Sequence, residues 1–398
     1  MNAWPLVSLA DLTSKIGSGA TPKGGQEAYK TAGVPLIRSM NVHDGQFLQR
    51  GIAYLSNEQA KSLDVATLRK GDVLLNITGA SVGRVCCLPE QYDGGRVNQH
   101  VAIIRPLPDR LSSKYLQHCL VNPKHKAILL QIAGAGATRE AITKVTIEQL
   151  EIPLPPLEEQ KRIAAILDQA DDIRRKRQHS IDRLNELGQA IFYEMFGDRK
   201  AASGWKHDCQ ELAAVCKKVT DGTHQVPEWS DEGVPFIFVS NVRDHKIDLN
   251  TKKFVSRSEY LKLTKNAKID AGDVLYTCVG SYGYTAVVDG KNEFVFQRHI
   301  AHIKPDKSLV QPQYLVWGLE APKIRQQADK LATGIAQKTV TLKALKSIEI
   351  PIPPFEMQID FSDRISVIEN QKKSLESDLK QLDSLFTSLQ HRAFTGQL

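Results

Sequence analysis

Two kinds of hydrophobic pattern alternate along the 398-residue chain. Short β-branched and aliphatic runs bounded by Gly, Pro and Asn predict strands, which span 72–78, 97–105, 273–279 and 294–304. Apolar residues at helical spacing predict helices over 114–133 and 312–331. Each half of the chain is therefore predicted to form a mixed α/β domain. A Pro-rich segment follows each domain, at 153–156 and at 351–354. Because proline ends a strand, these segments are predicted to be the domain boundaries.

The second pattern follows each Pro-rich segment. Apolar positions recur about every 3.5 residues from Leu157 to about Phe196 and from Phe355 to about Phe394, which predicts two helices of about 58 Å. The inward positions expected on the first helix are Ile163, Ile166, Ala170, Ile173, Arg177, Ser180, Leu184, Leu187 and Ile191. Those expected on the second are Phe361, Ile365, Ile368, Lys372, Leu375, Leu379, Leu382, Phe386, Leu389 and Ala393. We expect an antiparallel coiled coil of the two helices; the alternative is that each packs on its own domain.

The second half of the chain repeats the first. The run Gly33-Val34-Pro35-Leu36-Ile37 returns as Gly233-Val234-Pro235-Phe236-Ile237, and His100-Val101-Ala102 returns as His299-Ile300-Ala301. The order of matching segments is kept over a period of about 200 residues, so each copy is a domain rather than a solenoid unit of about 20–50 residues. The expected parts are a first domain, a helix, a second domain and a second helix, at 1–156, 157–197, 198–354 and 355–398.

Positive charge is concentrated in the two repeated domains. Residues 1–156 carry 17 Lys and Arg against 12 Asp and Glu, and residues 198–354 carry 23 against 18, so each has a net charge of +5. Residues 157–197 and 355–398 carry −1 and −2. Such a basic excess is expected of a domain that binds a polyanion. A solvated surface with a few extra lysines is the alternative.

Composition narrows the class of protein. No apolar run approaches the roughly 20 residues of a membrane helix, and the N-terminus does not resemble a signal peptide, so we expect a cytoplasmic protein with no membrane partner. The six cysteines form no CxxC pair and no zinc-site spacing. Phosphate-loop, HExxH and adenine-methylating motifs are absent from the sequence. These absences favour a binding role, with no catalytic residue, metal or cofactor in this chain.

Polar, Gly-punctuated segments recur in both domains and predict contacts with nucleic acid. Small residues let the backbone approach phosphate, Asn and Gln suit adenine edges, and Arg suits guanine. For any single residue, a structural role in a turn or in the core is an equal alternative. The segments recur in both domains with different side chains at their centres, however, and this favours recognition of two different DNA sequences. The candidate DNA-binding residues are Thr21, Lys23, Arg38, Asn41, Asn76, Thr78, Ser81, Arg84, Asn98, Gln99, Arg139, Thr223, His224, Asn241, Arg243, Ser281, Tyr282, Tyr284, Gln297, Arg298, Gln337 and Lys338.

This order of domains and helices resembles the specificity subunit of type I restriction–modification systems. The resemblance covers essentially the whole chain and rests on the run from Pro153 to Ile163, the ending from Leu389 to Leu398, and the opening Gly19-x-Thr21-Pro22. In the second helix, Glu356-Met357-Gln358-Ile359-Asp360 departs from the family's usual Glu-Gln-x-x-Ile.

The resemblance implies a non-catalytic subunit that binds double-stranded DNA. Each domain would read one half of a split target, and the helices would set the spacing and dock two methyltransferase subunits. Motor-nuclease subunits would complete the complex, and S-adenosylmethionine, ATP and Mg would belong to those partners. One alternative is an enzyme that acts directly on DNA, a nuclease or methyltransferase with unrecognised catalytic residues. Another is a dimeric scaffold without nucleic acid.

Overall fold

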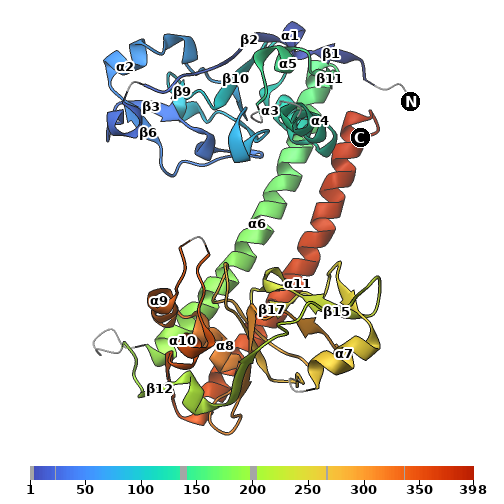
Figure 1. Cartoon of the computed structure of the whole chain (residues 1–398). Coiled ribbons are helices and arrows are strands. Elements are labelled where there is room, and N and C mark those ends of the chain that lie inside the picture. The colour runs from blue at the N-terminus through green and yellow to red at the C-terminus, as the bar shows by residue number, and fades with distance from the viewer. Residues whose placement is uncertain (1–3, 23, 135–140, 198–203, 266–267, 336) are drawn as a thin grey trace. The chain divides into compact units, whose positions relative to one another are not determined.

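The chain folds into two compact units in a computed structural model, which describes all residues except 1–3, 23, 135–140, 198–203, 266–267 and 336 (Figure 1). Unit 1 comprises Met1–Arg177 and Ser377–Leu398, and unit 2 comprises Gln178–Glu376. Each unit contains one repeated domain and one half of each long helix. The predicted fold class, two repeated mixed α/β domains and two long helices, is confirmed.

A four-stranded antiparallel sheet forms the centre of unit 1. Its spatial order is β2 (Thr13–Ser18), β10 (Val101–Pro106), β7 (Val73–Asn76) and β8 (Val85–Cys87). A smaller sheet has the order β6 (Ala53–Leu55), β3 (Val34–Ile37) and β9 (Arg96–Val97). Two strand pairs are β4 (Val42–His43) with β5 (Gln46–Phe47), and β1 (Leu6–Ser8) with β11 (Glu151–Pro153).

Side chains alternate between the two buried faces of this central sheet. Val73 and Leu75 join the core that the sheet shares with the helices, whereas Leu74 and Ile103 join the core that it shares with the smaller sheet. Because both faces are covered, β7, β8 and β10 are almost continuously apolar, whereas the edge strand β2 is mostly polar. The helices of the unit are α1 (Leu9–Leu12), α2 (Asn57–Lys61), α3 (Ser113–Val121), α4 (Pro123–Gly134) and α5 (Lys144–Glu148).

Unit 2 repeats this arrangement. Its central sheet has the order β13 (Cys216–Asp221), β22 (Ile300–Pro305), β19 (Val274–Thr277) and β20 (Thr285–Val287). The smaller sheet has the order β14 (Trp229–Ser230), β18 (Phe254–Val255), β15 (Val234–Ile237) and β21 (Val295–Phe296). Two strand pairs are β16 (Val242–Arg243) with β17 (Lys246–Ile247), and β12 (Cys209–Glu211) with β23 (Glu349–Pro351). Its helices are α7 (Arg257–Thr264), α8 (Pro312–Glu320), α9 (Pro322–Leu331) and α10 (Leu342–Lys346).

Two of the predicted strands, 97–105 and 294–304, each consist of two separate strands in the structure. The run 97–105 is divided between β9 and β10, which lie in different sheets, and 294–304 is divided between β21 and β22. A tight turn separates them: Val101 N donates to Asn98 O at 3.3 Å, and Ile300 N donates to Gln297 O at 3.1 Å. The polar residues in each run therefore turn the chain from one sheet to the other.

Two predicted helices are likewise broken in the middle. The stretch 114–133 contains α3 and α4, and 312–331 contains α8 and α9. The second helix of each pair begins with proline, whose ring disfavours helical backbone in the residue before it. Asn122 and Ala321 accordingly have extended ψ angles of 137° and 136°.

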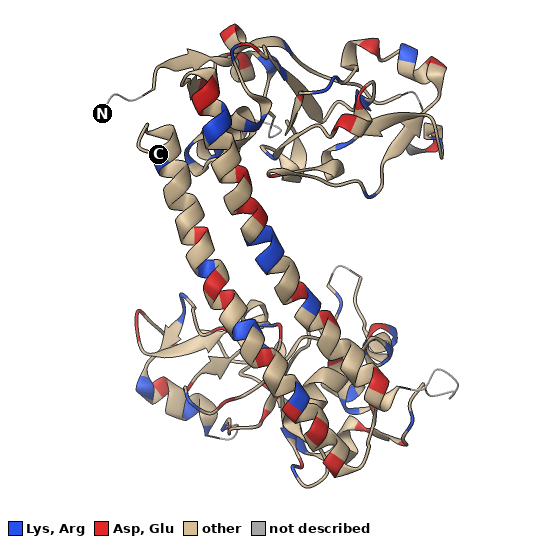
Figure 2. Ribbon diagram, turned by 180° about the vertical axis from the view of Figure 1, so that it is seen from behind, with Lys and Arg blue, Asp and Glu red and all other residues tan. Residues whose placement is uncertain are grey.

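The two long helices have the predicted bounds, α6 (Leu157–Phe196) and α11 (Phe355–Phe394), and each contains 40 residues. In unit 1 the start of α6 runs antiparallel to the end of α11. Arg174 Nη2 lies 2.6 Å from Asp383 Oδ1, and Arg177 Nη1 lies 3.2 Å from Asp378 Oδ2. Figure 2 shows acidic and basic residues along both helices. None of the helices formed by the described residues is long and apolar enough to cross a membrane.

Both halves of each helix contribute to a domain core. In unit 1, Ile163 and Leu167 of α6 join the same core as Phe386 and Ala393 of α11. In unit 2, Phe192 of α6 and Phe361 of α11 join one core, and their ring centroids are 5.4 Å apart. Helix pairing and packing on a domain, which the sequence offered as alternatives, therefore occur together in each unit.

The apolar stripe predicted for α6 was out of phase with the buried face. Ile173 and Leu187 were expected inside but are 44% and 47% exposed, and Ser180 is exposed as well. Ile163 is buried as predicted, and the other buried positions are Gln160, Ala164, Leu167, Ile181, Gly188, Phe192 and Phe196. Leu167, Ile181 and Gly188 are buried where Ile166, Ser180 and Leu187 were expected, so the buried face keeps its seven-residue spacing but is offset by one residue. On α11, Phe361, Ile365, Ile368, Lys372, Phe386 and Ala393 are buried as predicted.

The altered sequence at the start of α11 keeps the anchor found in α6. Gln160 Oε1 accepts a hydrogen bond from Ser112 N at 2.9 Å, and Gln358 Oε1 accepts one from Gln311 N at 2.9 Å. The amide of each glutamine also donates to two backbone carbonyls. Both helices are thus fixed to their own repeat in the same way.

Candidate nucleic-acid interface

Four segments of repeat 1 converge at one end of its central sheet. β2 ends at Ser18 and β7 ends at Asn76, and both ends pair with the first residues of β10. The loops that follow β2 and β7, and the turn that precedes β10, therefore leave the sheet at the same place. A bridge between Thr78 and Ala141 brings the segment before α5 to that place as well.

Polar side chains from three of these segments bond to one another. Thr78 Oγ1 lies 2.6 Å from His100 Nδ1, and Gln99 Nε2 lies 3.1 Å from His100 Nε2. Thr21 Oγ1 donates to Gln99 Oε1. The structure therefore brings together the candidates Thr21, Thr78 and Gln99. It adds His100, which was not a candidate although it recurs in the second copy.

The corresponding segments of repeat 2 converge in the same way. Thr223 bridges to Gln297, and Gly280 N donates to Lys338 O at 2.9 Å. Burial and the positive charge of Arg298 lower the pKa of His299, which keeps that ring neutral near pH 7. The exposed candidates are His224, Ser281, Arg298, Gln337 and Lys338, and the half-buried ones are Thr223 and Gln297.

Two recurring asparagines are bonded inside the fold. Asn41 Nδ2 donates to Leu48 O at 2.9 Å, and Asn241 Nδ2 donates to Asp248 O at 3.0 Å. The Oδ1 atom of each asparagine also accepts a hydrogen bond from the backbone N–H of the residue three positions before it. These bonds hold the β4–β5 and β16–β17 hairpins, which explains why the asparagine recurs.

Other candidates of repeat 1 divide between framework and surface. Asn76 is fully buried, and its Nδ2 donates to Ser81 Oγ at 3.1 Å; Asn98 is 6% exposed. Among the described residues, the half-buried Arg84 side chain has no hydrogen-bond or ion-pair partner. Lys23 and Arg139 lie outside the described residues.

The remaining candidates form contacts between side chains. The guanidinium carbon of Arg243 lies 4.0 Å from the centroid of the Tyr284 ring. Tyr282 OH donates to Asp329 Oδ1 at 2.6 Å. This hydrogen bond is the main cause of a raised pKa of Tyr282, and burial contributes less. The guanidinium carbon of Arg38 lies 5.4 Å from the centroid of the Tyr29 ring, and Arg38 Nη2 donates to Gly51 O at 2.6 Å. A cation–π contact of this kind fixes the guanidinium and the ring relative to each other.

Sequence reasoning missed one basic residue in each repeat that holds the Gly-rich loop. Lys126 Nζ donates to Gly83 O, and Arg325 Nη1 donates to Gly283 O at 2.9 Å. Both glycines have positive φ angles, 80° and 82°. Lys126 and Arg325 each stand three residues after the proline that begins α4 or α9. This shared position was a signal in the sequence that could have identified them.

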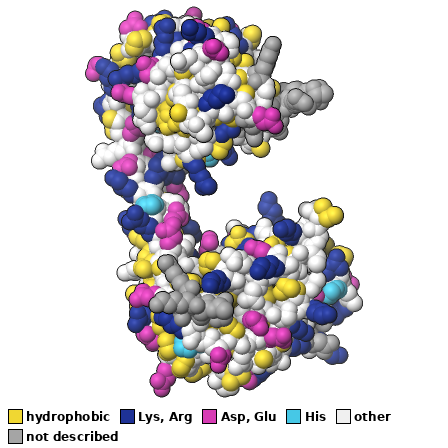
Figure 3. All heavy atoms as spheres, turned by 90° about the vertical axis from the view of Figure 1, so that its left-hand side faces the viewer, with side chains coloured by type: hydrophobic (Ala, Val, Ile, Leu, Met, Phe, Trp, Pro, Cys, Tyr) yellow, Lys and Arg dark blue, Asp and Glu magenta, His cyan; other side chains and the backbone are white. Residues whose placement is uncertain are grey.

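On the face of the molecule that Figure 3 shows, charge is mixed rather than confined to one patch. Figure 3 shows Lys and Arg side chains on each unit, interspersed with Asp and Glu. No group of three or more His, Cys, Asp or Glu in the described ranges could hold a metal ion. The polar loop ends described above are therefore the strongest candidate contacts.

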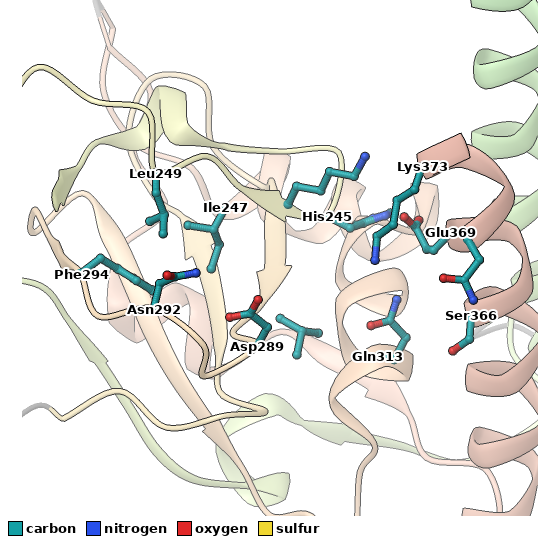
Figure 4. A pocket seen from close by; sticks show the side chains of 13 residues that line it. His245, Ile247, Leu249, Asp289, Asn292, Phe294, Gln313, Ser366, Glu369 and Lys373 are labelled. Atoms are coloured by element: carbon teal, nitrogen blue, oxygen red, sulfur yellow. The ribbon is translucent and has the colours of Figure 1, made fainter. Parts of the chain in front are cut away.

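Unit 2 also has a pocket of about 550 Å³ between the β16–β17 hairpin, α8 and α11 (Figure 4). Glu369 and Lys373 of α11 line it, together with Gln313 of α8. Within the part of the chain that the structure describes, Glu369 Oε1 is buried without a hydrogen-bond partner. At the corresponding positions of α6, Arg175 Nε lies 2.6 Å from Asp171 Oδ2.

Comparisons with known proteins agree on one family. The model described as "Type I restriction modification DNA specificity domain" matches residues 1–185 and 211–382. A putative type I restriction enzyme MjaX specificity subunit from Methanocaldococcus jannaschii is 25% identical over 99% of this chain and 93% of its own length. The EcoBI specificity subunit of Escherichia coli is 24% identical over 100% of this chain and 86% of its own.

Two solved structures show the same fold. The type I restriction–modification system S subunit from M. genitalium has a TM-score of 0.57 and 14% identity, covering 99% of this chain and 96% of that one. A chain from a structure described as the basis of complex assembly and conformational transition of the type I R-M system has a TM-score of 0.50 and 19% identity. That match covers 100% of this chain and 99% of the other.

Proposed function

Because this chain belongs to the type I restriction–modification DNA specificity family, we propose that each of its two repeats reads one half of a split duplex DNA target. In this proposal α6 and α11 set the spacing between the halves and dock two methyltransferase subunits. Motor-nuclease subunits complete the assembly. The chain itself performs no catalysis, and S-adenosylmethionine, ATP and Mg are used by the partners.

The observation that carries this proposal is the repeated convergence of loops with different side chains at their ends. Lys126 and Arg325 hold the same glycine loop in the two repeats. At the neighbouring turn, however, Gln99 of repeat 1 is replaced by Arg298. Two readers of different sequences require such a shared framework with different contacts.

The replacement at this turn supports different base preferences. Gln suits the paired acceptor and donor of adenine, whereas Arg suits the two acceptors of guanine. Both side chains are exposed at the end of the sheet where the loops meet. The net charge of +5 on each of 1–156 and 198–354 supports binding to a polyanion.

The continuous helices support the spacing role. Each is one 40-residue element whose first half belongs to one compact unit and whose second half belongs to the other. A change in helix length cannot be absorbed by a flexible linker, since both ends are packed in a core. Each added residue lengthens a helix by about 1.5 Å.

Mapping methylated adenines in DNA tests the assignment of repeats to half-sites. Arg298→Ala, expressed with the methyltransferase partner, should relax the sequence of one half-site and leave the other half and the spacer unchanged. The loss of one paired base contact should cost about 1–3 kcal/mol of discrimination.

Gln99→Ala is the matched control and should relax only the other half-site. Relaxation of both halves by either substitution would contradict the assignment of one repeat to each half. Methyl transfer by the purified chain without a partner would instead favour an enzyme that acts directly on DNA.

A further inference from the structure

Repeat 2 exposes a large aliphatic side chain beside its polar loop ends. Ile335 has a relative exposure of 106%, the highest of the large apolar residues that the structure describes. Single exposed aliphatic residues are common on protein surfaces and need no explanation alone. The position of Ile335 is unusual because its loop belongs to the proposed DNA interface, where Gln337 and Lys338 are also exposed.

The base of this loop is fixed by backbone hydrogen bonds. Thr333 N donates to Thr339 O at 2.9 Å, and Thr339 N donates to Thr333 O at 2.7 Å. Gly334 has a φ of 100°, and a Cβ there would lie 2.3 Å from Gln337 O, so the turn requires glycine. The loop therefore presents Ile335 from a defined base rather than from a loose end.

The base is tied in turn to the Gly-rich loop. Gly280 N donates to Lys338 O at 2.9 Å, and Val340 N donates to Cys278 O at 2.9 Å. Ser281 follows directly and is exposed. A molecule that contacts Ser281 and Lys338 therefore meets the loop that carries Ile335.

We propose that Ile335 is an apolar recognition residue, which seats against an apolar surface of the bases in the half-site read by repeat 2. Duplex DNA offers two such surfaces. One is the 5-methyl group of thymine in the major groove. The other is the face of a base at an opened step, where an inserted aliphatic side chain acts as a wedge. This inference rests on the proposed function and adds a residue that selects sequence without a hydrogen bond.

The test uses the full chain assembled with its methyltransferase partner and duplexes that carry the mapped target. In one series, deoxyuridine replaces each thymidine of the half-site in turn, which removes one methyl group. In the other, 2-aminopurine replaces each adenine, and its fluorescence rises when the base is unstacked. Affinity and fluorescence are measured for the original chain and for Ile335→Ala.

Ile335→Ala should weaken binding by roughly ten- to a hundred-fold, because burial of an isoleucine side chain is lost. A methyl contact predicts that one deoxyuridine weakens binding by the original chain but not by the variant. A wedge predicts a fluorescence rise at one step that disappears in the variant. Ile335→Val should retain most of either effect.

Leu309→Ala is the control, since Leu309 is 45% exposed in the turn that follows the far end of β22. It should behave like the original chain. Identical responses of the original chain and Ile335→Ala at every position would overturn the inference while specific binding stands. If the original complex did not prefer its target to a scrambled duplex, the inference and the proposed function would both fail.

Discussion

The two repeats join their long helices by different chemistry. In repeat 1, Asp168 of α6 lies 2.8 Å from His118 Nε2 and 3.4 Å from Lys114 Nζ, and Arg175 donates to Asp44 O at 3.0 Å. Repeat 2 has Ser366, Trp317, Gln313 and Lys373 at the positions of Asp168, His118, Lys114 and Arg175. The same interface is closed by charged groups in one copy and borders a pocket in the other (Figure 4).

Repeat 2 keeps one ion pair to its long helix, with Lys246 Nζ 2.6 Å from Glu376 Oε1 of α11, and adds aromatic packing at the position of His118. The ring centroids of Trp317 and His245 lie 4.3 Å apart, and Trp317 is 1% exposed. Gly188 of α6 makes room for this indole, because a Cβ there would lie 2.1 Å from Trp317 Cη2. The comparison teaches that duplication preserved the geometry of the interface, while the interactions that stabilise it diverged.

The largest effect is expected from Trp317→Ala. Removing this buried ring should cost unit 2 about 3–5 kcal/mol, through lost burial and the cavity left behind. The measurement is hydrogen exchange of the full chain, in which amides of α8 and of residues 178–196 should lose protection. Amides of α3 should keep theirs.

His118→Ala is the matched substitution in repeat 1. It removes a smaller side chain and one partner of the half-exposed Asp168, so its effect should be smaller and confined to unit 1. Equal losses from the two substitutions would show that the two interfaces do not differ in the way described.

A second comparison concerns one position on the two helices. Arg174 of α6 is paired with Asp383 at 2.6 Å, whereas Lys372, its counterpart on α11, is 1% exposed. Among the described residues, Lys372 Nζ has no hydrogen-bond partner. Lys372→Leu should therefore stabilise unit 2 by about 1–3 kcal/mol, since a buried unsatisfied group is removed.

Denaturant unfolding followed by tryptophan fluorescence measures this gain. Arg174→Leu is the control and should destabilise the chain, because it leaves Asp383 without its partner. A loss of stability in Lys372→Leu would mean that the ammonium group is satisfied in solution, and the contrast with Arg174 would then disappear.

The smallest effect, and one that depends on pH, is expected from Asp168→Asn. Burial alone would raise the pKa of Asp168, but the hydrogen bond with His118 and the charge of Lys114 outweigh it, and the net shift is downward. The carboxylate therefore stabilises unit 1 above its unfolded pKa of about 4, and this contribution is lost as pH falls through the lower folded value.

The side chain of Asp168 is 39% exposed, so the substitution should cost at most about 1 kcal/mol at pH 7 and less at pH 3. Unfolding at the two pH values measures the difference. Ser366→Ala, at the same place in repeat 2, should show no such dependence. A cost that is equal at both pH values would exclude the ion pair as its source.

The sequence allowed the architecture to be predicted, but not every break within it. Strong periodicity fixed the bounds of α6 and α11, and the repeat showed that there are two domains. Pattern alone did not show that Asn98 and Gln297 stand at turns between two sheets, because the flanking apolar runs read as one strand. The phase of α6 was missed by one residue, because Ile166, Ile173 and Leu187 form an apolar heptad series beside the buried one.

Recurrence also failed to separate framework residues from candidate contacts. Asn41 and Asn241 recur because each holds a hairpin, and Asn76 is fully buried. Gln99 and Arg298 differ between the copies yet stand at the exposed ends of equivalent turns. Identity between the copies at Asn41 and Asn241 therefore marks what the fold requires. Difference is a guide to what each copy recognises only together with exposure, because Asn76 differs from its counterpart Thr277 although both are fully buried.

The division of the chain into units has a consequence for its synthesis. Unit 2 is continuous in sequence, whereas the core of unit 1 includes Phe386 and Ala393, which are translated long after Arg177. The 199 residues of unit 2 lie between the two parts of unit 1, and at roughly 5–20 residues per second the ribosome needs about 10–40 s to make them. The domain that emerges first is thus completed last. During that interval the core of unit 1 lacks Phe386 and Ala393.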